Sequence, residues 1–206
     1  MIPLRKQYFD LMIEEENGCF DSHAEIFNEV LDITKPKNIL EIGFYRGGSA
    51  NLWLMMSDAR LLSVDPIFDN VTNEKLQREG RPIPSWQPQL DAVQKTTLNF
   101  PDRFEFIQKR TEKAFLDNNL EKDKYGLAWI DGDHWFQGVI KDIQICMQLN
   151  IPYFLFDDFN RDVVAAFHNF QQHFEIIKEY DKTIGINYEQ QAMLLVKNKE
   201  YREKAN

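Results

Sequence analysis

Two short apolar stretches that each end in acidic residues constrain the fold more than any other feature of the sequence. Leu127–Ile130 runs into an Asp-Gly-Asp-His turn, and Tyr153–Phe156 runs into a pair of aspartates. Apolar runs of this length that are bounded by turn signals are typical of strands buried on both faces. In open α/β sheets, ligands bind beyond the carboxyl ends of such strands. We therefore expect these acids and the histidine to meet at one edge of a parallel sheet.

The rest of the chain alternates between strand and helix patterns. Strands are expected at 38–42, 61–64, 103–107, 127–130, 152–156, 174–180 and 191–196. Helices are expected at 4–16, 22–35 with its N-cap at Asp21 or Ser22, 50–56, 89–99, 111–116, 135–149 and 161–171. This alternation predicts an α/β fold with a doubly wound (Rossmann-like), mostly parallel sheet and helices on both faces. Because the last two strands follow each other without a helix, we expect them to pair across a long loop and to add an antiparallel strand near the C-terminus.

The length of 206 residues fits one domain, 1–206, with a substantial core. Residues 1–20 contain an N-terminal helix that we expect to act as a lid or a dimer element. Residues 67–100 include the most turn-rich stretch of the chain and are expected to form a variable insertion on the substrate side. Trp86 in this insertion, and Trp135, are candidates for stacking on a sugar ring, although aromatic side chains more often lie in a core.

The net charge of −9, with 24 scattered Lys and Arg residues, argues against nucleic acid or an anionic membrane surface as a partner. The sequence contains no run of about 20 apolar residues that could span a membrane, and the N-terminus lacks the pattern of a secretory signal. Cys19 and Cys146 are too few for a disulfide framework, so reduced thiols and a cytoplasmic location are expected.

A glycine-bearing turn follows the first expected strand at residues 43–49. Gly43 and Gly47 allow a ligand to approach the backbone closely, and the helix beyond them offers free N–H groups. The G-x-G-x-x-G spacing of dinucleotide-binding turns is absent. Glu41 would repel a pyrophosphate but suits an ammonium or sulfonium centre. Asp65 ends the next strand, where an acid can accept hydrogen bonds from both hydroxyls of a ribose.

A family resemblance rests on these motifs in chain order: Glu41-x-Gly43, Gly47-x-Ser49, Asp65, the Asp-Gly-Asp-His turn at 131–134, and Asp157-Asp158. They resemble the class I S-adenosylmethionine-dependent methyltransferases over about residues 20–197. More narrowly, they are similar to metal-dependent O-methyltransferases of the catechol type and of the type that modifies macrolide and aminocoumarin sugars. The sequence departs from that pattern at Asn150-Ile151-Pro152, where the family commonly has two glycines.

The resemblance implies that S-adenosylmethionine is the cofactor, with contacts from Glu41, Gly43, Tyr45, Gly47, Ser49, Asp65, Arg110, Thr111 and Asp131. Asp65 would hold the ribose, and Arg110 or Thr111 would flank the adenine. The resemblance also implies that Mg²⁺ or another divalent cation is bound by Asp131, Asp157 and Asp158.

The expected activity is transfer of a methyl group to a hydroxyl of a small molecule, with a sugar favoured over a catechol. An alkyl hydroxyl is a poor nucleophile, and a metal bound by oxygen ligands would orient it and lower its pKa. A general base must then lie within hydrogen-bond reach of the reacting oxygen. His134 is the first candidate and Asp133 the second, although Asp133 could instead cap the helix that follows.

Three other interpretations are open at this point. The chain could be a nicotinamide-dependent oxidoreductase on the same fold, a non-catalytic methyltransferase-like binding module, or a methyltransferase that works without a metal. Homodimers are common in families of this kind. His23, His168 and His173 have no partner that the sequence identifies, and we expect structural roles for them.

Overall fold

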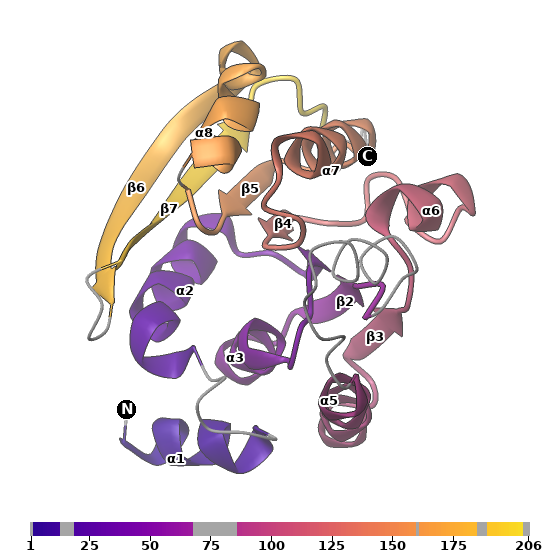
Figure 1. The fold of residues 1–206 in the computed structure, drawn as a ribbon, viewed down its shortest axis with the longest axis vertical. Coiled ribbons are helices and arrows are strands. Elements are labelled where there is room, and N and C mark those ends of the chain that lie inside the picture. The colour runs from indigo at the N-terminus through magenta and orange to yellow at the C-terminus, as the bar shows by residue number, and fades with distance from the viewer. Residues whose placement is uncertain (1, 13–18, 68–85, 160, 185–188, 204–206) are drawn as a thin grey trace, which may run out of the picture.

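The computed structural model describes residues 2–12, 19–67, 86–159, 161–184 and 189–203. In this part of the chain, seven strands form one sheet in the order β3-β2-β1-β4-β5-β7-β6 (Figure 1). The strands are β1 Asn38–Ile42, β2 Arg60–Val64, β3 Phe104–Ile107, β4 Leu127–Ile130, β5 Tyr153–Phe156, β6 Phe174–Ile184 and β7 Glu189–Asn198. The predicted doubly wound, mostly parallel sheet is confirmed.

Helices cover both faces of the sheet, and each face has its own core. One face carries α1 Ile2–Leu11, α2 Phe20–Thr34, α3 Gly48–Met56 and α5 Gln87–Asn99, and the other carries α6 Thr111–Leu116, α7 Phe136–Gln148 and α8 Arg161–His168. Successive strand residues alternate between the cores, so Ile39 and Trp129 lie in the first and Leu40 and Ile130 in the second. No helix in the described ranges is long and apolar enough to cross a membrane.

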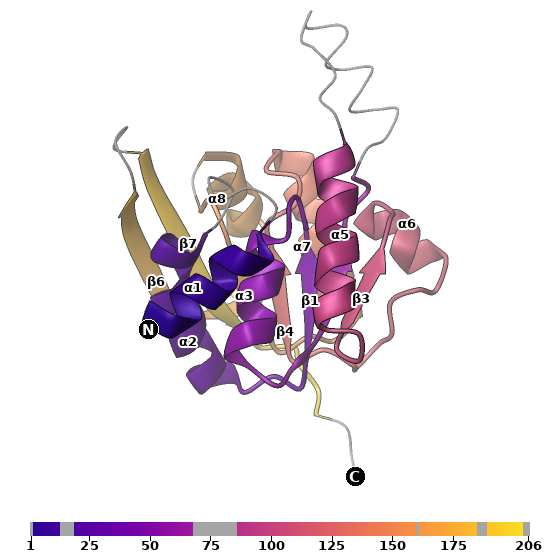
Figure 2. The ribbon, with the colours of Figure 1, turned by 90° about the horizontal axis from the view of Figure 1, so that it is seen from below.

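The register of the parallel strands brings their carboxyl ends to one level. Ile42 pairs with Val64 on one side and with Ile130 on the other, and Ile130 pairs with Phe156. The four residues after these strand ends therefore lie side by side at one edge of the sheet: Gly43, Asp65, Asp131 and Asp157. Figure 2 shows these strands behind α3 and α5. The pairing of the strands thus brings together the turns that follow β1, β2, β4 and β5.

The C-terminal strands form an antiparallel hairpin, as predicted. β7 is antiparallel to both β5 and β6, which leaves β6 at the edge of the sheet. The expected long loop between them is wrong, because main-chain pairing continues from Asp181 opposite Ala192 to Ile184 opposite Glu189. The apolar pattern of the sequence ends before the main-chain pairing does. The pattern alone therefore underestimates the length of the two strands.

Other expected boundaries differ from the structure. The second helix begins at Phe20 rather than after a cap at Asp21 or Ser22, because its N-cap is Cys19, whose N–H donates to the hydroxyl of Tyr8 at 2.8 Å. The helix expected at 161–171 ends at His168 and is followed by a short 3-10 turn, Gln171–His173. In the first helix and the 67–100 insertion, residues 13–18 and 68–85 lie outside the described part.

Candidate active site

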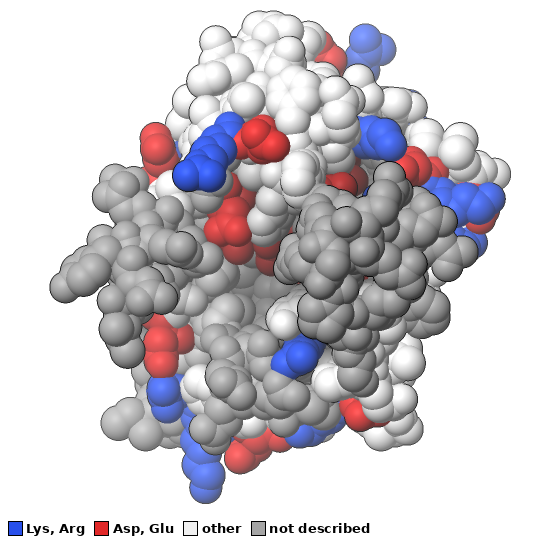
Figure 3. All heavy atoms as spheres, viewed as in Figure 1, with Lys and Arg blue, Asp and Glu red and all other residues white. Residues whose placement is uncertain are grey.

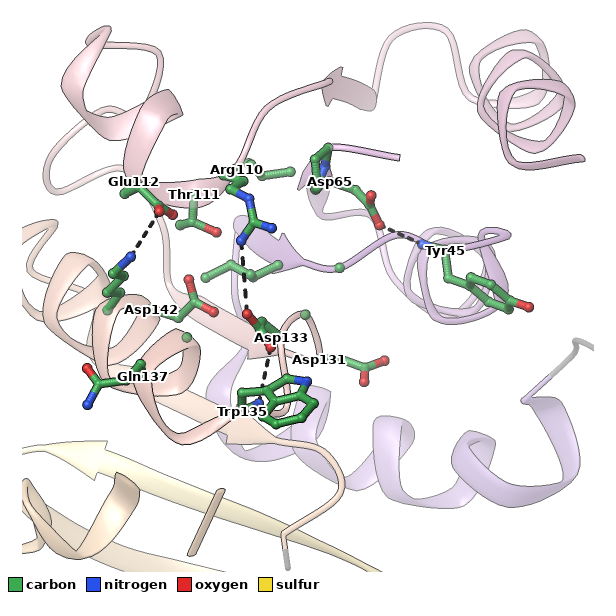
Figure 4. Close-up of a pocket in the computed structure, with 17 residues that line it drawn as sticks. Tyr45, Asp65, Arg110, Thr111, Glu112, Asp131, Asp133, Trp135, Gln137 and Asp142 are labelled. Atoms are coloured by element: carbon green, nitrogen blue, oxygen red, sulfur yellow. Dashed lines mark hydrogen bonds and ion pairs between the residues drawn. The ribbon is translucent and has the colours of Figure 1, made fainter. Parts of the chain in front are cut away.

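A cavity of about 530 Å³ opens beyond the carboxyl ends of β1, β2 and β4 (Figure 4). Six of the nine residues predicted to contact the cofactor line it: Gly43, Tyr45, Asp65, Arg110, Thr111 and Asp131. The other three, Glu41, Gly47 and Ser49, are not among the residues that line it. The sequence therefore identifies six residues that the structure brings together around one cavity, while each individual contact with a cofactor stays a prediction.

Gly43 allows the turn after β1 to cross directly against the turn after β4. Its φ is +94°, and a Cβ built on it would lie 2.1 Å from the carbonyl oxygen of Asp131. The Asp131 N–H donates to the carbonyl of Ile42 at 2.9 Å, so the two turns are also joined by a hydrogen bond. A side chain at position 43 would push these turns apart. Glycine is therefore required here by contact as well as by conformation.

Asp65 organises the same turn from the neighbouring strand. One carboxylate oxygen, Oδ2, accepts the N–H groups of Phe44 at 2.8 Å and Tyr45 at 3.0 Å, and the other, Oδ1, accepts the N–H of Ile67 at 2.5 Å. These bonds hold Tyr45 at a φ of +47°, which is uncommon for a residue with a side chain. The carboxylate thus lies on the cavity wall where the ribose is expected.

Glu41 lies behind the turn rather than on the cavity. It is completely buried, and its two carboxylate oxygens accept the hydroxyls of Ser49, at 2.6 Å, and Ser63. Burial raises the pKa of Glu41 to about 8. In this position the side chain connects β1 to α3 and β2, so it supports the glycine turn from below.

The opposite wall of the cavity is formed by residues after β3 and β4. The Asp133 carboxylate accepts the N–H of Trp135 at 3.2 Å and lies 4.0 Å from the guanidinium of Arg110. Figure 4 shows Asp133 directed toward Arg110, whereas Asp131 is directed away from it. Asp142 on α7 also borders the cavity, and burial raises its pKa to about 7 while a hydrogen bond from Thr111 opposes the shift.

His134 bridges two of the three predicted metal ligands. Its Nε2 lies 3.1 Å from Oδ1 of Asp131, and its Nδ1 lies 2.9 Å from Oδ2 of Asp158. These two carboxylates raise the pKa of His134 to about 10, and His134 in turn holds the pKa of Asp158 below its usual value. Burial and the neighbouring Asp157 raise the pKa of Asp131 to about 7. At neutral pH the imidazole is therefore the cation that lies between these acids.

The third acid, Asp157, is paired with a histidine that sequence reasoning left as structural. His23 on α2 and Asp157 are both 7% exposed, and His23 Nε2 lies 3.5 Å from Asp157 Oδ2. The signal in the sequence was the helical spacing of His23 with Phe27 and Val30, which places a polar ring on a buried face. A buried polar group needs a partner, and Asp157 is that partner.

These side chains form one acidic cluster, which we call the acceptor cluster: His23, Asp131, His134, Asp157 and Asp158. Acidic atoms lie in the hollow at the centre of the molecular face in Figure 3. The predicted meeting of the acids from β4 and β5 is therefore observed. The described residues nevertheless include no group of three or more His, Cys, Asp or Glu side chains arranged to hold a metal ion. The predicted metal is not confirmed.

The strand order, the cavity beyond β1, β2 and β4, and the glycine turn define a class I methyltransferase fold. The family model described as a methyltransferase domain matches residues 40–159, which is more than half of the chain. The protein therefore belongs to this methyltransferase family, and the resemblance seen in the sequence is confirmed. No curated protein matches the sequence.

Solved methyltransferase structures share the fold at low sequence identity. An O-methyltransferase from Bacillus cereus in complex with SAH is 14% identical with a TM-score of 0.59, over 86% of this chain and 81% of that one. The O-methyltransferase TomG from Streptomyces achromogenes is 11% identical with a TM-score of 0.57, over 85% and 78%. The N-methyltransferase NodS from Bradyrhizobium japonicum is 12% identical with a TM-score of 0.53, over 88% and 99%. Because two of these proteins are named as O-methyltransferases and one as an N-methyltransferase, the fold by itself does not identify the acceptor.

Proposed function

We propose that this protein transfers the methyl group of S-adenosylmethionine to a hydroxyl of a small molecule, and that the acceptor is a sugar rather than a catechol. The observation that carries the proposal is the position of Asp131. This residue lines the cavity expected to hold the cofactor, and its carboxylate also contacts His134 in the acceptor cluster. The site expected for the methyl donor and the groups that would act on a hydroxyl therefore meet at Asp131.

Residues that follow three of the strands would bind the cofactor at the cavity wall. Asp65 would accept hydrogen bonds from the ribose, Gly43 gives the backbone room to approach a ligand, and Arg110 and Thr111 line the part of the wall that follows β3. S-adenosylmethionine, when bound, supplies an electrophilic methyl group on a sulfonium. A carboxylate beside that position, such as Asp131, favours the positive charge.

The proton of the acceptor hydroxyl must be removed by a group close to the reacting oxygen. His134 is predicted as this base, but between two carboxylates it holds its own proton at neutral pH. Asp131, with a pKa of about 7, is the member of the pair that is able to take a proton there. We propose that Asp131 and His134 act together as the base. Asp133 is disfavoured because it lies beside Arg110 on the cavity wall.

A divalent metal stays a prediction of the sequence resemblance. The three acids do gather, but His134 takes the place between Asp131 and Asp158, so the side chains as they lie do not fit a metal ion. The proposed proton transfer therefore uses only the protein's own side chains. Titration with Mn²⁺, followed by electron paramagnetic resonance in wild type and in the Asp158→Asn variant, tests the prediction directly.

A sugar acceptor is supported by the chemistry of the cluster and by the resemblance. Carboxylates accept hydrogen bonds from hydroxyls, and a sugar offers several of them on neighbouring carbons. The Asp-Gly-Asp-His turn is also more similar to the sugar-modifying branch of the family than to the catechol branch. A homodimer, as in related families, remains a proposal that size-exclusion chromatography would test.

The decisive experiment measures binding first and transfer second. Isothermal titration with S-adenosylmethionine, S-adenosylhomocysteine and NADH should show binding of the first two only. Methyl transfer from isotopically labelled S-adenosylmethionine is then followed by mass spectrometry over nucleotide sugars, free sugars and catechols. A labelled sugar ether supports the proposal. Binding of NADH alone would indicate an oxidoreductase, and cofactor binding without transfer to any acceptor would indicate a binding module.

A further inference from the structure

A chain of side-chain contacts connects α2 to the acceptor cluster. Ser22 Oγ lies 2.5 Å from His23 Nδ1, and the opposite ring nitrogen of His23 faces Asp157 at 3.5 Å. Ser22 and His23 are remote in sequence from the strand tips that carry the acids. Neither residue lines the cavity expected to hold the cofactor. Their contact with the site is therefore through Asp157.

Packing fixes the orientation of the His23 ring. Its edge meets the rings of Phe27 at 5.5 Å and Trp129 at 6.1 Å, in nearly perpendicular arrangements of 84° and 81°. Ser22 Oγ donates to the carbonyl of Cys19 at 3.0 Å and lies 2.5 Å from His23 Nδ1. Because a carboxylate oxygen only accepts hydrogen bonds, the contact with Asp157 places a hydrogen on His23 Nε2. Ser22 thus holds the ring at its other nitrogen while Nε2 donates to Asp157.

Only one oxygen of Asp157 is engaged by this contact. The other, Oδ1, is buried and has no hydrogen-bond partner among the described residues. A buried acceptor without a partner is costly and marks a place where a donor is expected. Asp157 lies beside Asp131, because it contributes to the raised pKa of that residue and follows the strand paired with β4. The donor would therefore lie next to the proposed reacting position.

We propose that Ser22 and His23 are positioning residues that hold Oδ2 of Asp157, so that Oδ1 accepts a hydrogen bond from a second hydroxyl of the acceptor. This inference rests on the proposed function and extends it, because it defines the acceptor as a compound with two neighbouring hydroxyls. One hydroxyl meets Asp131 and His134 and is methylated. The other is bound by Asp157 and sets the orientation of the molecule.

Steady-state kinetics test this role with three variants. His23→Ala and Ser22→Ala remove the contact chain, whereas His23→Gln keeps an N–H donor near the position of Nε2. We expect His23→Ala to raise the acceptor KM about 10- to 100-fold, because Asp157 loses the contact that orients its carboxyl group toward the second hydroxyl. His23→Gln should recover most of that loss. The Kd for S-adenosylhomocysteine should stay within about twofold of wild type, since neither residue lines the cavity.

A matched control is His173→Gln, because His173 lies on the 3-10 turn and pairs with Glu200 away from the cluster. An acceptor lacking the second hydroxyl should show the raised KM already with wild-type protein and no further loss in His23→Ala. The proposal is wrong if His23→Ala leaves KM unchanged, if His23→Gln is no better than His23→Ala, or if cofactor affinity falls in parallel.

Nitrogen-15 NMR of the imidazole rings provides a readout that needs no turnover. In wild type, His23 should show the tautomer with hydrogen on Nε2, and Ser22→Ala and Asp157→Asn should each shift its signals toward an averaged state. An averaged His23 signal in wild type would contradict the proposal. If wild type methylates no acceptor, the proposed function fails, while the NMR result still decides whether the contact chain exists.

Discussion

The cavity beyond β1, β2 and β4 and the acceptor cluster both contain carboxyl groups, but different partners stabilise those groups in the two regions. Asp65 accepts backbone N–H groups and Glu41 accepts serine hydroxyls, all from residues of the β1-α3-β2 unit and of the turn that follows it. In the cluster, Asp157 is held by His23, which lies 134 residues away, and His134 lies between two other acids. One region is built from local turns and the other from contacts between distant segments.

The difference in their partners suits the two regions to different roles in the proposed reaction. A turn whose N–H groups are held by a carboxylate of the neighbouring strand end is already ordered before a ligand binds, which suits recognition of an unchanging cofactor. Imidazoles between carboxylates can move protons and hydrogen bonds, which suits chemistry on the acceptor. Substitutions in the two regions should therefore affect different kinetic constants.

The largest expected effect comes from His134→Gln in the acceptor cluster. Removing the imidazole should lower kcat about 10²- to 10⁴-fold, because the proton-transfer pair is lost. The Kd for S-adenosylhomocysteine should change less than about twofold, since His134 does not line the cavity. Rapid-quench turnover and isothermal titration measure the two quantities. A parallel loss of cofactor affinity would show that the two regions are not separable in this way.

Asp65→Ala should produce the opposite result in the cavity. Loss of the ribose contacts and of the bonds to Phe44 and Tyr45 should raise the Kd for S-adenosylhomocysteine about 100-fold. The control is Asp117→Ala, because Asp117 pairs with Lys109 and Lys113 outside the cavity. Unchanged affinity of Asp65→Ala for the cofactor would remove Asp65 from the binding site.

Gly43→Ala acts on the contact between the two regions. Because the new Cβ would lie 2.1 Å from the Asp131 carbonyl, the free energy of unfolding should fall by about 2–4 kcal/mol. Gly126→Ala is the matched control, with a nearest contact of 3.2 Å, and should cost less. Urea denaturation monitored by tryptophan fluorescence compares them. Equal stability of the two variants would show that the turns can separate freely.

The last expected effect is on the pH dependence of stability. The folded-state pKa of Glu41 is raised to about 8, above its unfolded value, so the folded protein binds the extra proton. Its contribution to stability is therefore present at low pH and is lost as pH rises toward 8, with a slope of at most about 1.4 kcal/mol per pH unit. Glu41→Gln should flatten the dependence of Tm on pH between 5 and 8. An unchanged profile would mean that Glu41 is ionised in the folded protein.

Local sequence patterns were sufficient to predict the fold and to indicate that six residues of the cavity wall lie close together. Apolar runs, glycines and terminal acids lie within a few residues of each other, and the register of a parallel sheet then aligns them. The partnership of His23 with Asp157 was missed because it depends on where α2 packs. The raised pKa of His134 was also not predicted, because it depends on Asp131 and on Asp158 beyond the end of β5, which together flank the ring in the fold.

The first helix has a consequence for how the chain reaches its native state. Tyr8 is fully buried, its hydroxyl donates to the carbonyl of Gly48, and the carbonyl of Met12 accepts from Lys95. The ribosome makes α1 before α3 and α5, so the helix leaves the exit tunnel with its apolar side exposed. That side is buried only after α3 and α5 have been synthesised. Until α3 and α5 are made, a chaperone that binds nascent chains would find an exposed apolar surface on this segment.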